Sequence, residues 1–210
     1  MSQILALFPL QLVAFPTENL NLHIFEPRYR QLMKECEEED KTFGIPAFIG
    51  GSVQEYGTEL ELVEIVKRYP DGKLDVKTRG IGIFRIDEFY SRVPNKLYAG
   101  AKVKKMKYDN KSDILLSTKI VERIATLFEL MKINKTIPNA ADFFTFGMGH
   151  HVGFSIEQEY ELLSIQSEQD RQEFMLAHLD KLIPVVREME ELRKRVQMNG
   201  HFKDVIPPKI

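Results

Sequence analysis

Apolar and polar residues alternate through much of the first half of the chain, and this period of two predicts β-strands. Leu20, Leu22 and Ile24 alternate with polar neighbours, and a longer alternation runs from Glu59 to Lys67. At Pro70–Lys73 a turn is expected, because proline presets φ and glycine accepts a positive φ. Further strands are expected over residues 4–8, 74–78, 81–89 and 97–106. This pattern predicts an antiparallel, strongly bent sheet that forms a partly closed barrel.

Two glycines flank Ile81 at the start of the expected strand 81–89. Gly80 and Gly82 lie inside an otherwise strand-like pattern. Glycine within a strand indicates a bulge or the close approach of another backbone.

One helix is predicted within this β-rich half. Pro27 suits the first helical position, where its missing N–H would have no partner in any case. Tyr29, Leu32, Met33 and Cys36 then follow at the spacing of one helical face. The helix should span about residues 27–39, and the acidic run that follows Cys36 is interpreted as its solvated end.

Beyond the polar stretch 108–112 the apolar period becomes helical. A capping box is expected where Ser155 precedes Gln158 by three residues. A short aromatic helix is expected over 140–148, and Pro184 should kink or split the last helix. The apolar positions that carry the two longer helices are Leu116, Ile120, Ile124, Leu127 and Met131, then Met175, Leu179, Leu182, Val186, Met189 and Val196.

These patterns together predict an α+β protein. A β-rich pseudo-barrel should occupy residues 1–107, with its one helix near 27–39. A helical subdomain should follow over 113–199, and 200–210 should form an extended tail. The near-heptad seam from Met175 to Val196 is also a candidate surface for a homodimer.

Composition places the chain among ordinary globular proteins. With 210 residues and a net charge of -2, it should bury roughly 70% of its unfolded surface and need no disulfide or metal. The one cysteine fits a reducing compartment, so a cytoplasmic location is expected. The apolar N-terminus has no Lys or Arg and does not resemble a signal peptide. Apolar runs are shorter than the roughly 20 residues of a membrane span.

A search for catalytic motifs predicts no enzyme. The sequence has no Walker phosphate loop, no G-x-S-x-G elbow and no histidine in a zinc-binding spacing. The glycine pair at 80 and 82 is only a fragment of a dinucleotide fingerprint. Cys36, the single possible thiol nucleophile, lies on the apolar face of the predicted helix and should be inert. No catalytic residue, no metal and no cofactor is therefore expected. An enzyme with dispersed carboxylates stays open as an alternative.

The segment from His23 to Arg30 has the highest density of functional side chains. Glu26, Arg28 and Arg30 surround the start of the predicted helix. They are interpreted as a buried or half-buried ion-pair corner that locks the strand to the helix and joins the two halves of the structure. The alternative is a peptide contact, since arginine binds carboxylates in either setting.

A small basic cluster near residue 105 raises the possibility that the protein binds nucleic acid. Lys102, Lys104, Lys105 and Lys107 fall on the last predicted strand. Lysine is typical of an edge strand that must stay soluble. An RNA-binding face needs nearby aromatic residues and more arginine, so nucleic acid is not favoured.

Several stretches resemble the N-terminal substrate-binding domain of the Lon protease family, and the string from His23 to Arg30 is the most specific. The resemblance covers roughly residues 3 to 198. It rests on Phe8–Leu10, Phe15–Pro16, Leu22–Arg30, Phe43–Pro46, Gly57–Ile65, Asp71–Lys73, Gly80–Ile86, Leu162, Leu163, Ser167 and Arg171.

The resemblance implies a pseudo-barrel similar to PUA domains, followed by a helical bundle. In complete Lon proteases this region helps to capture protein substrates and to assemble the hexamer. No ATPase module and no serine–lysine proteolytic motif accompanies it here. We therefore expect a protein that binds proteins or unfolded polypeptide segments without catalysis. RNA binding, by analogy with PUA domains, is the alternative.

Candidate peptide contacts are expected at the junction of barrel and helices. Glycine lets another backbone approach closely, which suggests Gly44, Gly80 and Gly82. Phe43 and Phe84 would supply apolar contact. The competing and favoured interpretation is that both phenylalanines belong to the core. In that case the binding surface is expected on the far face of the helical bundle.

Overall fold

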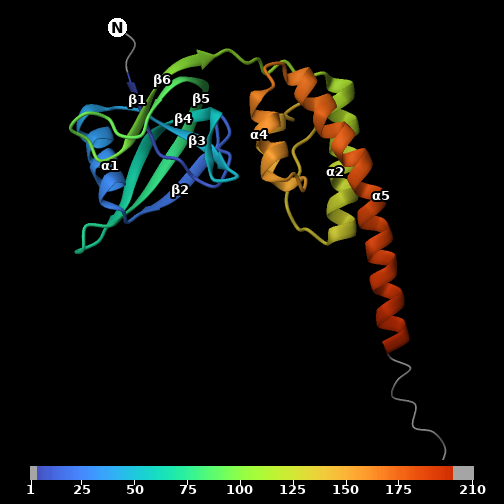
Figure 1. The fold of residues 1–210 in the computed structure, drawn as a ribbon. Helices are drawn as coiled ribbons and strands as arrows, with labels where there is room; N and C mark the ends of the chain where they lie inside the picture. The colour runs from blue at the N-terminus through green and yellow to red at the C-terminus, as the bar shows by residue number, and fades with distance from the viewer. Residues whose placement is uncertain (1–3, 201–210) are drawn as a thin grey trace, which may run out of the picture. The chain divides into compact units, whose positions relative to one another are not determined.

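A computed structural model of the protein describes residues 4–200, with side chains described as far as Gln197. Figure 1 shows the order of the elements along the chain. The strands are β1 (Ile4–Leu7), β2 (Asn19–Ile24), β3 (Phe43–Ile49), β4 (Ser52–Arg68), β5 (Leu74–Tyr90) and β6 (Ala99–Met106). The helices are α1 (Pro27–Glu39), α2 (Ile114–Met131), α3 (Thr145–Met148), the 3-10 turn η1 (Gly149–His151), α4 (Ile156–Ser164) and α5 (Glu168–Gly200).

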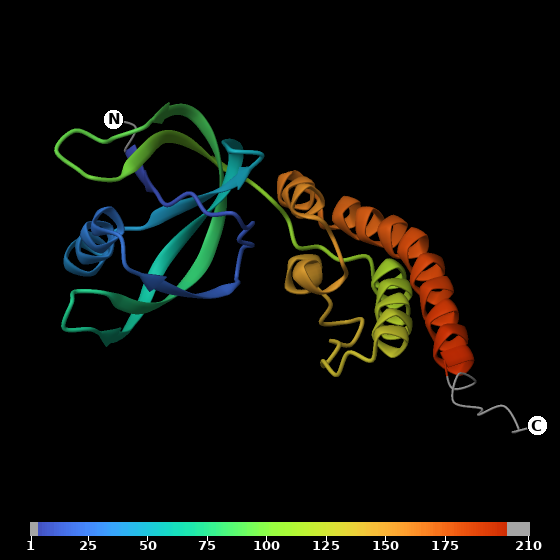
Figure 2. The same cartoon turned by 60° about the horizontal axis from the view of Figure 1, so that its bottom comes forward.

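Five of the strands close into a barrel. The sheet runs in the order β2-β5-β4-β3-β1-β6, and β6 pairs with β5 as well. Figure 2 shows the closed arrangement from a second direction. The long strand β5 makes this possible, because its first part pairs with β2 and its second part pairs with β6. The expected α+β class and barrel are confirmed.

The glycine pair in β5 has both of the predicted features. Glu59 lies opposite Gly82 and Leu60 lies opposite Gly80, so Ile81 forms a bulge. The N–H of Gly80 donates to the carbonyl oxygen of Glu18 at 2.9 Å. A methyl group at Gly80 would lie 2.3 Å from the carbonyl oxygen of Phe15. The backbone that approaches this glycine therefore belongs to the chain itself.

Helix α1 covers one side of the barrel core. Its predicted apolar face is buried, and Asp40 ends it in the left-handed conformation. Each buried side chain of this size stabilises the fold by roughly 1.5–3 kcal/mol. The α1 residues Tyr29, Leu32, Met33 and Cys36 share one core with residues of the barrel and its loops, including Phe8, Phe43, Ile45, Leu60 and Val76.

The chain divides into two compact units, Met1–Lys111 with Phe144–Arg171 and Ser112–Phe143 with Gln172–Ile210. We call them the barrel unit and the helical unit. The segment 144–171, which the sequence assigned to a helical subdomain, groups with the barrel. Phe146 stacks on Phe15 with ring centroids 5.1 Å apart. The backbone N–H of Tyr56 donates to the Tyr160 hydroxyl oxygen at 3.2 Å.

One helix prediction needs correction and one is confirmed. The aromatic helix expected over 140–148 spans only Thr145–Met148. The preceding residues form a turn, in which the Asn139 side chain accepts from the N–H groups of Ala141 and Asp142. The capping box at Ser155 is present.

The helical unit is built from α2 and most of α5. Ile120, Ile124 and Leu127 are buried, as are Met175 and Leu179. Arg123 of α2 pairs with Asp180 of α5 at 2.7 Å.

Helix α5 continues as one element through Pro184 for 33 residues. Of the two expected outcomes, a kink or a split, the split is absent, because an interior proline removes only one backbone hydrogen bond and Pro184 is exposed. The kink stays a prediction. Gly200 ends α5, and the rest of the tail expected to be extended lies outside the described residues. Within residues 4–200, no helix is long and apolar enough to span a membrane.

Candidate functional site

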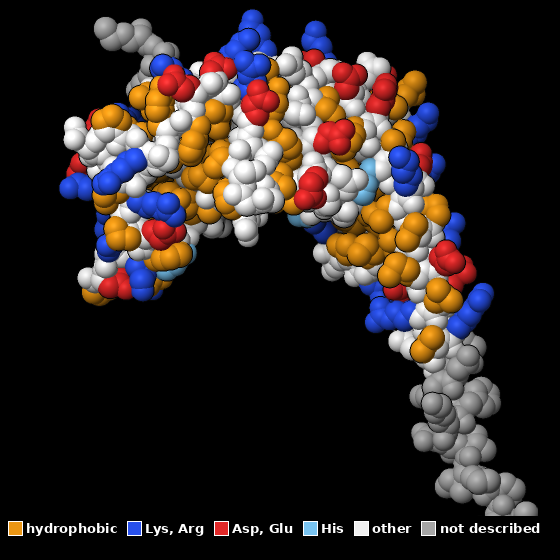
Figure 3. All heavy atoms as spheres, viewed as in Figure 1, with side chains coloured by type: hydrophobic (Ala, Val, Ile, Leu, Met, Phe, Trp, Pro, Cys, Tyr) orange, Lys and Arg blue, Asp and Glu red, His pale blue; other side chains and the backbone are white. Residues whose placement is uncertain are grey.

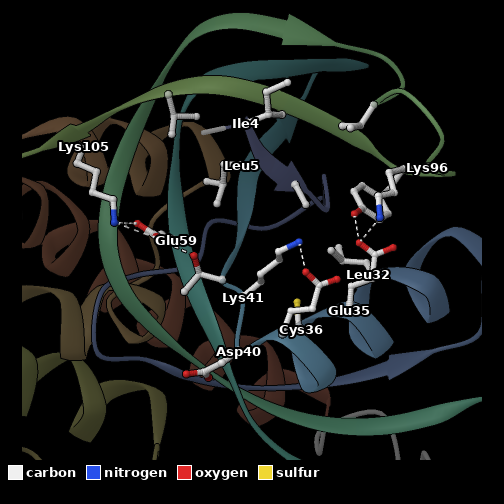
Figure 4. Close-up of a pocket in the computed structure, with 16 residues that line it drawn as sticks. Ile4, Leu5, Leu32, Glu35, Cys36, Asp40, Lys41, Glu59, Lys96 and Lys105 are labelled. Atoms are coloured by element: carbon white, nitrogen blue, oxygen red, sulfur yellow. Dashed lines mark hydrogen bonds and ion pairs between the residues drawn. The ribbon is translucent and has the colours of Figure 1, made fainter. Parts of the chain in front are cut away.

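The barrel unit contains an open groove of about 520 Å³. We call it the α1–β6 groove; Figure 4 shows its side chains. Its walls come from α1, β1, β6, one residue of β4 and the loops on either side of these elements. The apolar lining residues are Ile4, Leu5, Ala6, Leu32, Cys36, Val93 and Val103. An apolar side chain of a ligand could therefore be buried between the helix and the strands.

Glu35 is a largely buried carboxylate in the wall of the groove. Its side chain is 12% exposed. The ammonium group of Lys96 and the hydroxyl of Tyr98 both donate to its Oε2 atom, at 2.8 and 2.6 Å. Burial, the largest influence, raises the pKa of Glu35, but the hydrogen bonds from Lys96 and Tyr98 outweigh it, so the pKa is lowered. The carboxylate is therefore ionised at neutral pH.

A second carboxylate, Glu59, lies on the opposite side of the groove. Its side chain is 8% exposed, whereas that of its partner Lys105 is 75% exposed. The ammonium group of Lys105 lies 2.9 Å from Glu59 Oε2. The Thr42 hydroxyl donates to Glu59 Oε1 at 2.7 Å. A third pair, Lys41 with Glu39, is 2.5 Å apart and about half exposed.

The chemistry of the groove favours binding over catalysis. Cys36 is one of the lining residues, and burial, reinforced by the negative charge of Glu35, raises the pKa of Cys36 to about 12. A thiol with such a pKa is protonated at neutral pH and is a poor nucleophile. Among the residues that the structure describes, no group of three His, Cys, Asp or Glu is arranged to hold a metal ion.

The residues that were expected to contact a peptide do not line the α1–β6 groove. Phe43 and Phe84 are both fully buried, so neither ring is accessible, as the core interpretation requires. A methyl group at Gly44 would lie 2.7 Å from the Phe84 ring, which shows that this glycine makes room for the core. Gly80 receives the chain's own backbone, and only Gly82 has open space beside it.

The expected ion-pair corner forms, but mostly at the surface. Arg28 pairs with Glu26 at 2.8 Å, with side chains 49% and 37% exposed. Arg30 donates to the carbonyl oxygen of Asp71 at 2.9 Å. All these residues belong to the barrel unit, so the corner does not join the two halves.

A fully buried ion pair of the barrel unit lies elsewhere among the described residues. Arg171 and Glu168 lie 2.8 Å apart, and neither side chain is exposed. Arg171 also donates to the carbonyl oxygens of Ile165, at 2.7 Å, and Asp109. Glu168 accepts from the N–H and the hydroxyl of Thr145. The charge pattern did not single out this pair; only the resemblance included Arg171.

His150 forms a second link that the sequence missed. Its ring nitrogens lie 2.8 Å from Glu159 and 3.3 Å from Glu18. Burial lowers the pKa of His150, but the two carboxylates outweigh it and raise the pKa to about 9. The imidazolium therefore ties α4 to the segment before β2.

The basic cluster does not lie on an edge strand. Strand β6 pairs with β1 on one side and with β5 on the other. Lys102 pairs with Glu88 at 2.6 Å, and Lys105 pairs with Glu59 as described. The edge-strand interpretation is therefore wrong, because barrel closure covers both edges of β6.

Comparisons with known proteins agree with this fold. The family model of the ATP-dependent protease La (LON) substrate-binding domain matches residues 4–181. The crystal structure of a Lon N-terminal domain protein from Xanthomonas campestris is 26% identical, with a TM-score of 0.64 over 83% of this chain and 98% of that chain. The N-terminal domain of the Mycobacterium avium complex Lon protease shares the fold at 12% identity, with a TM-score of 0.61 over 85% of this chain and 98% of that chain. The chain therefore belongs to the LON substrate-binding domain family.

Proposed function

We propose that this protein is a non-catalytic module that binds proteins or unfolded polypeptide segments in the α1–β6 groove. The observation that carries the proposal is an open groove lined by both apolar and charged side chains in a member of the LON substrate-binding domain family. Unfolded segments present apolar and charged side chains together, so they match both parts of the lining. Binding sites of this kind are typically concave and largely apolar, with a few polar groups.

The absence of catalysis is part of this proposal. The protonated Cys36 thiol and the missing phosphate-binding loop both support it. We expect the pure protein to show no magnesium-dependent ATP turnover and to leave bound protein uncleaved. Measurable hydrolysis of ATP would contradict this part. The single cysteine supports a cytoplasmic location.

RNA binding is the competing function. Lys102 and Lys105 are each paired with a glutamate, and this argues against a basic face. A labelled RNA oligonucleotide in the same assay separates the two functions.

Fluorescence anisotropy tests the proposal directly. The probe is fluorescein-labelled lysozyme that has been reduced and carboxymethylated, so that it stays unfolded. Ile4 lies in the groove and is 38% exposed, whereas Phe89 lies outside the groove and is 44% exposed. Ile4→Asp should weaken binding about tenfold, and Phe89→Asp should not change it, because an apolar contact contributes about 1.5 kcal/mol. Equal binding by both variants and the wild type would exclude the groove.

We also infer that the helical unit pairs with a second copy of the chain through the outer part of α5. Four apolar side chains there are 51–70% exposed and are spaced by four, three and four residues, as in a coiled coil. In Figure 3 apolar side chains lie along the outer part of α5, among charged side chains. The four are Val185, Met189, Leu192 and Val196.

Charge on one side of this seam supports an antiparallel pairing. Glu188 and Arg195 are seven residues apart, so they occupy equivalent positions beside the seam. In an antiparallel pair centred between Met189 and Leu192, Glu188 of one copy faces Arg195 of the other.

A further inference from the structure

The charges of the α1–β6 groove lie at two depths. The carboxylates of Glu35 and Glu59 are held in the wall, with side chains 12% and 8% exposed. Their partners reach them from the rim, since the side chains of Lys96 and Lys105 are 31% and 75% exposed. The negative charges are therefore fixed, whereas the positive charges are carried by long flexible side chains that water can solvate.

A cationic ligand group can exploit this difference in depth. An ammonium or guanidinium group placed beside Glu59 would replace Lys105, which then extends into water. The exchange keeps the buried carboxylate paired, and the Thr42 hydroxyl bond to Glu59 stays in place. The lysine loses a partner only at an exposed position, where the loss costs little.

Binding of an anionic ligand group would instead leave a buried carboxylate of the groove without its counter-ion. To bind a ligand carboxylate, Lys105 has to turn away from Glu59 or share its charge with a second anion. Glu59 would then be a buried carboxylate with only the Thr42 hydroxyl beside it, and burying a charge without a counter-ion is costly. The same reasoning applies to Lys96 and Glu35.

We propose that the groove selects polypeptide segments in which a lysine or arginine lies among apolar residues, and that it discriminates against acidic segments. This selectivity rests on the proposed polypeptide binding. The lining holds four carboxylates (Glu35, Glu39, Asp40 and Glu59) against three ammonium groups (Lys41, Lys96 and Lys105), a formal excess of one negative charge. The apolar lining residues contact the residues that flank the basic side chain.

Three short peptides with blocked ends and one labelled lysozyme test the inference. The peptides share one apolar sequence and differ only at a central Lys, Gln or Glu. At low salt the Lys peptide should bind about tenfold more tightly than the Gln peptide, because one charge-assisted hydrogen bond is added. The Glu peptide should bind most weakly, and added salt should reduce the differences.

Variants identify the groups responsible. Glu59→Gln should remove most of the preference for the Lys peptide, and Lys105→Gln should tighten its binding, because a competitor of the ligand is gone. Lys102→Gln is the matched control, since Lys102 pairs with the exposed Glu88 outside the groove. If circular dichroism shows that Glu59→Gln does not fold, the inference is tested with Lys105→Gln alone.

The outcomes separate this inference from the proposed function. Equal affinities for the three peptides, or tightest binding of the Glu peptide, would overturn the selectivity while the groove still bound polypeptide. Weaker binding of the Lys peptide by Lys105→Gln would also overturn it. If neither the peptides nor the unfolded lysozyme bind, the proposed function fails and the selectivity fails with it.

Discussion

The guanidinium group of Arg171 and the carboxylate of Glu168 lie 2.8 Å apart, one turn apart on α5, and neither side chain is exposed to solvent. Backbone carbonyl oxygens of Ile165 and Asp109 accept further hydrogen bonds from the same arginine. A buried charge is tolerated only when it is paired and its remaining hydrogen-bonding groups are satisfied. This pair therefore holds the segment around Asp109 to the start of α5.

Replacing Arg171 should destabilise the protein strongly. Arg171→Met leaves the Glu168 carboxylate buried without its counter-ion, which should lower the free energy of unfolding by about 3–5 kcal/mol. Arg28→Met is the control, because the half-exposed pair with Glu26 should contribute only about 0–1 kcal/mol. Urea denaturation followed by circular dichroism measures both. Equal losses in the two variants would contradict the importance assigned to burial.

Stability should depend on the protonation of His150. Its pKa is raised to about 9 in the folded protein, against about 6.5 in the unfolded chain. Because the folded pKa is the higher one, the stabilisation is fully present below the unfolded pKa of about 6.5 and is lost as the pH rises through the folded pKa.

The variant His150→Gln isolates this effect. The difference in unfolding free energy between wild type and His150→Gln should be largest at low pH and should shrink as the pH is raised past about 9. The groups that face the imidazole are the carboxylates of Glu18 and Glu159. A difference that did not change with pH would show that the imidazolium is not what links these segments.

Gly44 of β3 and Gly82 of β5 should respond differently to substitution by alanine. A methyl group at Gly44 would lie 2.7 Å from the Phe84 ring, whereas nothing lies within 4 Å of one at Gly82. Gly44→Ala should therefore destabilise the protein by about 1–3 kcal/mol through overpacking. Gly82→Ala should stay within about 0.5 kcal/mol of the wild type. Thermal denaturation of the two variants side by side decides the comparison.

The proposed pairing through α5 predicts a concentration-dependent dimer. Leu192→Asp should shift sedimentation velocity profiles to the monomer, because it places a charge in the seam. Leu115→Asp is the control, since Leu115 is 72% exposed on α2, outside the seam. Glu188→Arg should weaken the antiparallel dimer and the added Arg195→Glu should restore it, since close opposite charges across such seams set partner orientation. A wild type that stays monomeric at high concentration would exclude this surface.

The sequence by itself determined the local elements and the fold class. Pro27 and the apolar spacing that ends at Cys36 are enough to predict α1, because both depend on neighbours within a few turns. The Ser155 capping box is equally local. The alternation through β4 predicts a half-buried strand, and several such strands predict a barrel.

Tertiary structure decided which charges are buried, and with them the candidate site. In sequence, Glu26 with Arg28 and Glu168 with Arg171 are two similar short-range pairs, yet only the second is enclosed. Glu59 of β4 and Lys105 of β6 are 46 residues apart and meet because both strands pair with β5, opposite Gly82 and Phe84. Burial depends on which distant segments cover a side chain, and that is a property of long-range packing. Local periodicity reports only the face on which a residue lies, so it does not distinguish a solvated ion pair from a buried one.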